Sequence, residues 1–447
     1  MGLLDRLRSE SGPKVAFLGI DGVPYSLLEN HFDEFENLAA IAADGAAGAI
    51  DSIVPPESSA CWPALTTGVN PGKTGVYGFQ DRETGTYDTY VPMGRDVQAR
   101  RLWNRVQAAD RESVVMNVPV TFPPEREPDR MVSGFLSPGL DDAAYPDEFQ
   151  SFLGQRDYRI DVDARLGHED DKTAFLEDAY ETLDRRFEAF QDVITGGGWD
   201  LFFGVFMTTD RVNHFLFGDY DRDGQYRAEF LEFYRTLDTY IGRLRDALPD
   251  DTTLVVASDH GFTTQEYEVN MNAWLNQAGY LSYRTDDPDE LDDIADETQA
   301  YSLIPGRIYI NREGREPRGS VADGDYERIR DALATALTEL TGPDGTPVVA
   351  DVVRKEDAFR GPHVDIAPDL VAIPAHGFDL KAGFHTDSPV FDTGPRNGMH
   401  SFKNTSLFVD NPEVTIGEAD LYDIAPTILS LLEVEYDRGE FDGTSLI

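Results

Sequence analysis

The stretch Lys14–Val23, KVAFLGIDGV, is the clearest indication of the fold. After Lys14 it stays apolar to residue 20 and shows no alternation of apolar and polar side chains. Such a run is typical of a strand that is covered on both faces of a sheet. Asp21 and Gly22 end the run, and apolar side chains then recur at helical spacing at Leu27, Leu28, Phe32, Phe35 and Leu38. We therefore expect a buried strand, a turn and a helix.

The same order of elements recurs at two later places. Residues 201–207, LFFGVFM, lead into Asp210, and residues 253–257, TLVVA, lead into Asp259 and His260. Unbroken apolar strands separated by helices predict an α/β fold with a mostly parallel central sheet sandwiched by helices. Ligand sites in such sheets lie beyond the carboxyl ends of the strands, so we expect these polar residues to converge there.

The chain divides by composition into a core and an inserted region. Residues 263–397 contain an Asp-rich run at 286–297, many Gly and Pro turns, a helical pattern near 324–340 and short strand patterns. We predict that residues 13–262 and 398–447 form the core and that residues 263–397 form a cap subdomain, although this region could instead extend the core. Two more helices are expected at 226–248 and at 421–432, the second interrupted by Pro426.

Charge and composition exclude several classes of protein. The chain has 447 residues with 38 Lys and Arg against 83 Asp and Glu, a net charge of -45. A surface this acidic is unsuited to nucleic acid, and its self-repulsion is screened best in molar salt, so we expect a halophilic source. The single cysteine excludes an internal disulfide. We see neither a signal peptide nor a membrane span and expect a cytoplasmic protein, with its oligomeric state open.

Six side chains suggest a metal centre. Three carboxylates and three imidazoles stand at strand ends or in short polar motifs: Asp21, Asp210, His214, Asp259, His260 and His400. Mixed ligands of this kind suit two divalent ions, zinc or manganese, which can clamp the entering and leaving oxygens of a displacement at phosphorus. Each residue also has a simpler interpretation, as a helix cap or a packed histidine. Of the other histidines, we expect His385 to lie closest to the pocket.

Motifs spread along the whole chain resemble the alkaline phosphatase superfamily, in its type I phosphodiesterase/nucleotide pyrophosphatase branch. They are LGIDGV at 18–23, PPESSACWPALTTGVNPGKTG at 55–75, TTDRVNH at 208–214, ASDHGF at 257–262, GMHSF at 398–402, and DLYDIAPTILSLLEV with DGTSL at the end. The resemblance implies an alkaline phosphatase-like fold and a metal-dependent hydrolase that acts on small phosphate esters.

The resemblance also implies roles for single residues. One metal would be held by Asp210, His214 and His400, and the other by Asp21, Asp259, His260 and the nucleophile. The nucleophile of this family lies nine residues before the Thr of a Thr-Gly pair, which is Ser58 here, with Ser59 as the alternative. Its oxygen would attack phosphorus and form a covalent seryl-phosphate.

Other activities of the superfamily stay open: a phosphomonoesterase, a phosphoglycerate mutase-like phosphotransferase, and a sulfo- or phosphonohydrolase. Formylglycine chemistry is disfavoured because Cys61 lies three residues out of register, so we expect Cys61 to be a packed apolar residue. Phe79 stands where nucleotide pyrophosphatases carry an asparagine for a phosphate oxygen. That role would pass to the Ser59 backbone N–H or to Lys73.

Overall fold

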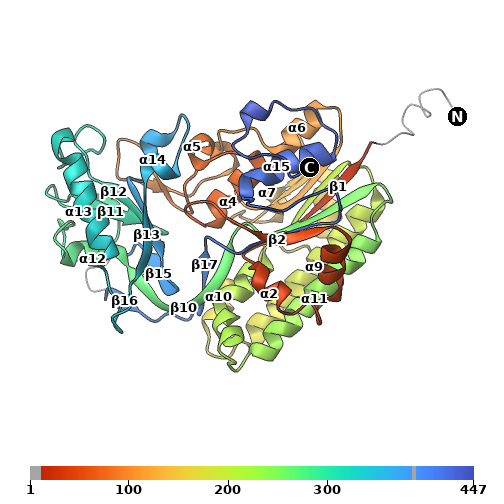
Figure 1. Cartoon of the computed structure of the whole chain (residues 1–447), viewed down its shortest axis with the longest axis horizontal. Coiled ribbons are helices and arrows are strands. Elements are labelled where there is room, and N and C mark those ends of the chain that lie inside the picture. The colour runs from red at the N-terminus through yellow and green to blue at the C-terminus, as the bar shows by residue number, and fades with distance from the viewer. Residues whose placement is uncertain (1–11, 385–388) are drawn as a thin grey trace.

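The computed structural model of the chain describes residues 12–384 and 389–447 (Figure 1). Its largest sheet has eight strands. In spatial order they are β2 (Ala46–Ile50), β18 (Thr405–Val409), β9 (Thr252–Ala257), β1 (Lys14–Ile20), β8 (Leu201–Phe206), β5 (Ser113–Val118), β6 (Arg130–Ser133) and β7 (Ala144–Tyr145). The five strands from β9 to β6 run parallel. At one edge β18 pairs antiparallel with both β9 and β2, and at the other β7 pairs antiparallel with β6. The mostly parallel sheet predicted from the sequence is confirmed.

Helices cover both faces of this sheet. Along β1, Ala16, Leu18 and Ile20 pack into one apolar cluster, whereas Val15 and Phe17 pack into another. The first cluster is shared with α3 (Glu36–Asp44), α9 (Thr173–Gly196), α10 (Thr208–Asp221) and α11 (Arg227–Asp246). The second is shared with α4 (Ser58–Thr67), α6 (Leu102–Ala108) and α15 (Ile424–Leu431). The two groups lie on opposite sides of the sheet in Figure 1, which explains why β1 is apolar throughout.

The prediction of one helix through Leu27 to Leu38 is wrong in one respect, because the chain forms two helices there. They are α2 (Tyr25–Glu29) and α3, separated by a turn. The start of α3 is capped from another helix, since the backbone N–H of Leu38 donates to the Asp238 carboxylate of α11 at 2.8 Å. A cap that comes from two hundred residues away leaves no local sequence signal.

Pro426 does not interrupt the last helix as expected. A short 3-10 turn at Leu421–Asp423 precedes α15, and Pro426 falls in the first turn of that helix. A proline is tolerated there because the first backbone N–H groups of a helix have no partner within it.

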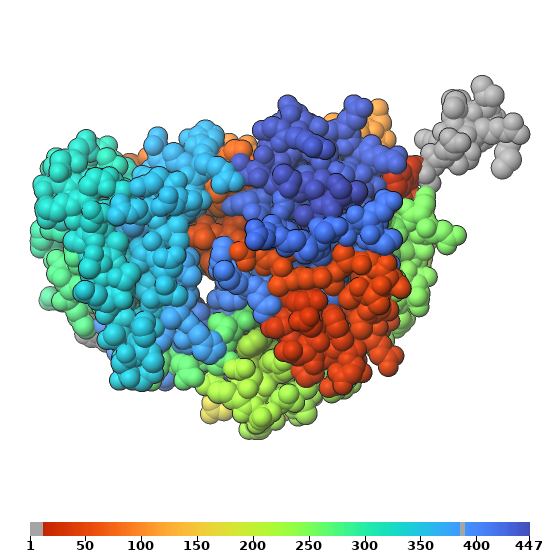
Figure 2. All heavy atoms as spheres, in the orientation of Figure 1, coloured from red at the N-terminus to blue at the C-terminus, as the bar shows by residue number. Residues whose placement is uncertain are grey.

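A second lobe is built around its own sheet and apolar cluster. The sheet contains β11 (Ala300–Leu303), β12 (Arg307–Ile310), β14 (Leu370–Pro374) and β13 (Val349–Arg354), flanked by α12 (Met271–Gln277) and α13 (Tyr326–Thr338). Strand β10 (Gly261–Asn270) runs from the core into this lobe beside β15 (Gly377–Lys381), β16 (Phe391–Asp392) and β17 (Gly398–Ser401). Figures 1 and 2 show the lobe at one end of the molecule, in green to light blue.

The hairpin of β3 (Asp81–Arg82) and β4 (Thr89–Tyr90) also packs on the second lobe. Asp81 forms a buried ion pair with Arg307, and Tyr87 belongs to the apolar cluster of that lobe. These residues come from the part of the sequence assigned to the core, and the boundaries at 263 and 397 stay a prediction. Within residues 12–384 and 389–447, no helix combines the length and the apolar character needed to cross a membrane.

Candidate metal centre

The six predicted metal ligands meet at the carboxyl edge of the parallel strands. Asp21 follows β1 and Asp259 follows β9, while Asp210 lies in the first turn of α10 after β8. Strand register brings the first two together, because Gly19 of β1 pairs with Ala257 of β9. Asp21 is anchored further when its N–H donates to the Phe206 carbonyl at 3.2 Å. The convergence expected for a parallel sheet therefore occurs here.

One group of ligand atoms comes from Asp21, Asp259 and His260. His260 Nε2 lies 3.7 Å from Asp21 Oδ1 and 3.6 Å from Asp259 Oδ2. The three side chains are fully buried and offer atoms that all lie within 4.8 Å of one another. This spacing suits three ligands around one cation.

A second group comes from Asp210, His214 and His400. Asp210 Oδ1 lies 3.5 Å from His214 Nε2 and 3.3 Å from His400 Nε2, and the two Nε2 atoms are 3.1 Å apart. Zinc–ligand bonds of about 2.0–2.1 Å in a tetrahedron place the ligand atoms roughly 3.3 Å apart. The observed triangle has these dimensions. The rings of His260 and His400 stack at 3.9 Å, so the two groups are adjacent.

Backbone carbonyls orient all three imidazoles. His214 Nδ1 lies 3.1 Å from the Gly398 carbonyl, His260 Nδ1 3.0 Å from that of Gly261, and His400 Nδ1 3.1 Å from that of Pro56. Since Nδ1 donates outward in each ring, Nε2 carries the free lone pair and faces the carboxylates. A pattern of this kind presets imidazoles for metal binding.

The electrostatics of the carboxylates also fit cations. Asp210 Oδ1 and Asp259 Oδ2 are buried, and neither accepts a hydrogen bond of good geometry from a residue in the described part of the chain. Burial raises the pKa of Asp259 to about 7, and the negative charge of Asp210 adds to the rise. Burial likewise raises the pKa of Asp21 well above its usual value, with the Asp259 and Asp210 charges adding to it. A divalent cation would relieve this repulsion and take up the unpartnered oxygens.

The buried imidazoles also have the protonation state that a metal ion requires. Burial lowers the pKa of His260, and it holds the pKa of His214 well below its usual value. Both rings are therefore neutral near neutral pH, which is the form that binds a metal. The donor set and its protonation thus fit a pair of divalent cations.

Ser58 lies against this centre at the start of α4. Its Oγ is 3.1 Å from His260 Nε2 and 3.3 Å from Asp21 Oδ1. Trp62, one turn further along the helix, donates from Nε1 to Asp21 Oδ2 at 2.6 Å and so fixes that carboxylate. In the first turn of α4, the Ala60 and Cys61 N–H groups donate to the Glu57 carbonyl at 2.8 Å. The Ser59 N–H bonds the Glu57 carboxylate, so it is not free to hold a phosphate oxygen as expected from the sequence.

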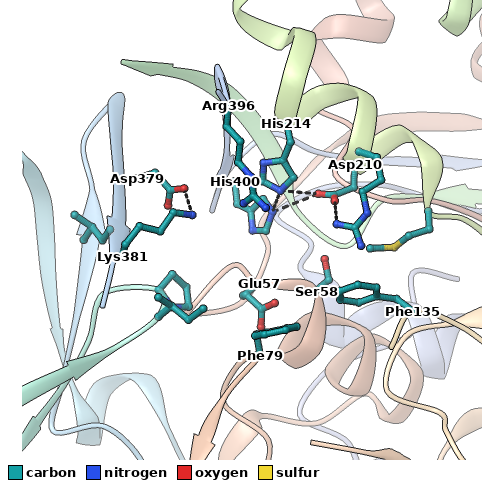
Figure 3. Close-up of a pocket in the computed structure, with 15 residues that line it drawn as sticks. Glu57, Ser58, Phe79, Phe135, Asp210, His214, Asp379, Lys381, Arg396 and His400 are labelled. Atoms are coloured by element: carbon teal, nitrogen blue, oxygen red, sulfur yellow. Dashed lines mark hydrogen bonds and ion pairs between the residues drawn. The ribbon is translucent and has the colours of Figure 1, made fainter. Parts of the chain in front are cut away.

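A cavity of about 230 Å³ opens in front of Ser58 (Figure 3). Asp210, His214 and His400 form one part of its lining. Figure 3 shows Phe79 and Phe135 on the Ser58 side, and Asp379 and Lys381 facing them from the second lobe. The remaining lining residues are Glu57, Met207, Arg211, Ile304, Pro305, Leu380 and Arg396.

Several of these pocket residues were not predicted from the sequence. Glu57 precedes Ser58, and burial raises its pKa to about 7. Arg211 could have been found, because it follows Asp210 and pairs with it at 3.1 Å. Lys381 and Arg396 lie between residues 263 and 397, where no local sequence pattern marks them.

Other predicted positions lie elsewhere. Lys73 binds Asp442 at 2.8 Å and is absent from the cavity lining, so it is not placed to hold a phosphate oxygen. Cys61 is fully buried in the apolar cluster around α4, which confirms that it is a packing residue. Burial raises the pKa of its thiol well above the usual value. His385 lies outside the described residues.

Comparisons with known proteins agree with the fold and identify the family. The family model described as type I phosphodiesterase/nucleotide pyrophosphatase matches residues 15–403. A search of the curated proteins finds no match.

Solved structures with the same fold include three hydrolase relatives. Phosphonoacetate hydrolase from Sinorhizobium meliloti 1021, in complex with phosphonoformate, has a TM-score of 0.62 at 16% identity, covering 94% of this chain and 96% of its own. Murine ectonucleotide pyrophosphatase/phosphodiesterase 5 has a TM-score of 0.57 at 13% identity, covering 94% and 95%. The human protein of the same name has a TM-score of 0.57 at 14% identity, covering 96% and 97%.

The alkaline phosphatase-like fold predicted from the sequence is thereby confirmed, and the family model spans most of the chain. Membership supports metal-dependent hydrolysis of phosphoesters as the class of activity. The chain belongs to the type I phosphodiesterase/nucleotide pyrophosphatase family.

Proposed function

We propose that this protein hydrolyses small phosphate esters of the phosphodiester or pyrophosphate type through a covalent intermediate on Ser58, with two divalent cations. The observation that carries the proposal is the position of Ser58 Oγ, 3.1 Å from His260 Nε2 and 3.3 Å from Asp21 Oδ1, at the floor of the cavity. A serine oxygen so close to two candidate ligands suits a nucleophile better than a structural cap.

Each side chain of the centre has a proposed role. Asp210, His214 and His400 would hold one cation, and Asp21, Asp259, His260 and Ser58 would hold the other. When bound, the cations would lower the pKa of the Ser58 hydroxyl and offset the charge that develops on the phosphoryl and leaving oxygens. We assign both sites to zinc, with manganese as the alternative, because three imidazoles and three carboxylates suit these ions.

The reaction proceeds in two displacements. Ser58 Oγ loses its proton to solvent and forms a bond to phosphorus, while the bond from phosphorus to the leaving oxygen breaks. Water then attacks the same phosphorus, the Ser58–phosphorus bond breaks, and the phosphate or monoester product leaves. The positive end of the α4 dipole, at Ser58, favours the charged oxygens in both steps.

Two single substitutions test the nucleophile. Ser58→Ala should lower kcat by about a thousandfold or more, as expected when a nucleophile is removed. Ser59→Ala is the matched control, because its Oγ is buried without a hydrogen-bond partner in the described residues and its backbone N–H is retained. Mass spectrometry of the quenched enzyme should find the phosphoryl group on Ser58, with the remaining ester group still attached when the substrate is a diester. Full activity in Ser58→Ala would remove the assignment.

A panel of chromogenic substrates separates the activities within the superfamily. Bis(p-nitrophenyl) phosphate, p-nitrophenyl phosphate, p-nitrophenyl phenylphosphonate and p-nitrophenyl sulfate share one leaving group. An inactive variant of the murine relative was solved in complex with AMP, and that ligand supports diester or nucleotide-type substrates here. We expect the diester to be the best substrate, and exclusive turnover of the sulfate or the monoester would contradict this.

The net charge of -45 also supports adaptation to molar salt. Dialysis to low salt should lower the unfolding temperature sharply, and an unchanged temperature would contradict the idea. A cytoplasmic location and the lack of nucleic acid partners stay predictions from the same composition.

A further inference from the structure

The second lobe contributes two cations to the cavity wall opposite Ser58. Lys381 ends β15, and Arg396 lies two residues before β17. Figure 3 shows Lys381 with Asp379 on the far side of the cavity, and Arg396 extending toward His214 and His400. These positive charges stand out in a chain whose net charge is -45.

Hydrogen bonds to helix α10 fix the backbone next to Arg396. Its neighbour Asn397 receives a bond from the Gly218 N–H at 3.0 Å, and donates to the His214 carbonyl at 2.9 Å and to Asp219 at 2.8 Å. Helix α10, which carries two of the candidate metal ligands, therefore also fixes the base of Arg396. The position of the Arg396 backbone beside the cavity is therefore set by the core helix, and ligand binding has only to order the Arg396 side chain.

The charge of Arg396 is not balanced within the described residues. Arg211 lines the same cavity but pairs with Asp161 at 2.8 Å and with Asp210 at 3.1 Å. Asp379 forms an ion pair with Lys381, and no ion pair or hydrogen bond joins the Arg396 guanidinium to any residue in 12–384 or 389–447. Near the second lobe, one carboxylate thus faces two cations, and one positive charge is left over.

The surroundings show how near this charge lies to the centre. Arg396 lines the same cavity as the candidate ligands His214 and His400, and Figure 3 shows it beside them. For Asp379, burial opposes ionisation, but Lys381 holds its pKa below the usual value with help from His400 and Arg396. Arg396 therefore lies within electrostatic reach of both walls of the cavity.

We propose that Arg396, together with Lys381, binds a second anionic group of the substrate, a carboxylate or a phosphate, while the scissile phosphorus sits at Ser58. This inference rests on the proposed function, since it takes the Ser58 side as the place of the reacting phosphorus. Arg396 supplies a planar fork that matches either oxyacid, and Lys381 supplies a charge that Asp379 holds in place. Ser58, Lys381 and Arg396 line one cavity of about 230 Å³, so a molecule that carries both groups can reach all three.

Binding of short phosphonates tests the subsite without relying on turnover. Propylphosphonate, phosphonopropionate and ethylene diphosphonate share one phosphonate and differ in the far end, which is methyl, carboxylate or phosphonate. Calorimetry on the zinc-loaded protein, in the lowest salt that keeps it folded, should give at least about tenfold tighter binding for one or both anionic ends. The better of the two identifies the preferred group.

Variants show which residue binds the anionic group at the far end of the phosphonate ligands. Arg396→Ala should reduce the preference to less than about threefold, with Arg396→Lys intermediate and Lys381→Ala weaker than Arg396→Ala. Arg328→Ala is the matched control, because Arg328 is an exposed arginine of the same lobe that pairs with Asp325. It should keep the full preference.

Three results would overturn the inference: no preference in the wild type, the same preference in Arg396→Ala, or equal weakening of all three ligands. The last would mean that Arg396 acts on the reacting phosphorus or on folding, which the melting temperature of the variant separates. Turnover that depends on Ser58, with no preference for an anionic end, would leave the proposed function standing. A binding preference that depends on Arg396, in a protein whose turnover does not depend on Ser58, would support the anion subsite and contradict the proposed function.

Discussion

The two walls of the cavity differ in how their residues are held. On the core side, Asp210 lines the cavity, and Asp21 and Asp259 lie buried behind it. All three follow neighbouring parallel strands, so the sheet itself sets their spacing. On the opposite wall, Lys381 ends β15 of the second lobe, and Arg396 belongs to the segment before β17 that Asn397 ties to α10. The comparison suggests that the first wall performs the reaction and the second selects the substrate.

The same substitution on each wall gives the largest expected contrast. Asp259→Asn removes a candidate metal ligand and leaves buried His260 without one of its partners, so we expect turnover to fall by about a thousandfold or more. Asp379→Asn releases Lys381 on the other wall and should cost less than about tenfold. Steady-state kinetics with a chromogenic diester measure both, and similar losses would break the distinction between the walls.

The link between the lobes gives the next largest effect. Arg307 is fully buried, forms an ion pair with Asp81, and also donates to the carbonyls of Gln80 and Ile304. Asp81→Asn would leave this guanidinium buried without its counter-ion, at a cost of about 3–5 kcal/mol. Chemical denaturation should show this loss. Asp325→Asn, which breaks an exposed pair with Arg328, should cost less than about 1 kcal/mol; equal losses would mean that Asp81 does not join the lobes.

A smaller effect should appear in the pH dependence of the metal-free protein. The pKa of Asp259 is raised to about 7 in the folded state, chiefly by burial, against about 3.9 in an unfolded chain. The folded state therefore binds more protons between about pH 4 and 7, and its stability falls as pH rises through this window. We expect a loss of roughly 1–3 kcal/mol from Asp259 in the presence of a chelator.

Denaturation of the wild type and of Asp259→Asn at pH 5 and pH 8 isolates this contribution. The wild type should lose more stability than the variant between the two values. Zinc should remove the difference in the wild type, because cation binding favours the ionised carboxylate. A variant with the same pH dependence as the wild type would show that Asp259 is not the group responsible.

The candidate ligands could be predicted because local patterns mark them. Asp21 and Asp259 each follow an apolar strand, and His214 lies one helical turn after Asp210. Ser58 needed the resemblance to the family, since its closeness to His260 depends on two distant segments. The chain contains no comparable local signal for Arg396.

Some parts of the fold could not be predicted from the sequence, because they depend on contacts between distant segments. The start of α3 depends on Asp238, two hundred residues away. The hairpin near Tyr87 joins the second lobe through contacts with residues far along the chain, such as Asn311, whose Oδ1 accepts from the Tyr87 hydroxyl at 2.7 Å. Features that rest on long-range packing leave little trace in local periodicity.

The most direct test of the account is the number of metal ions in the purified protein. Elemental analysis after loading with zinc in high salt and removal of free metal should find two ions per chain, and one in either Asp210→Asn or Asp259→Asn. A wild type that retains no zinc or manganese under any of these conditions, while still folded, would contradict the account.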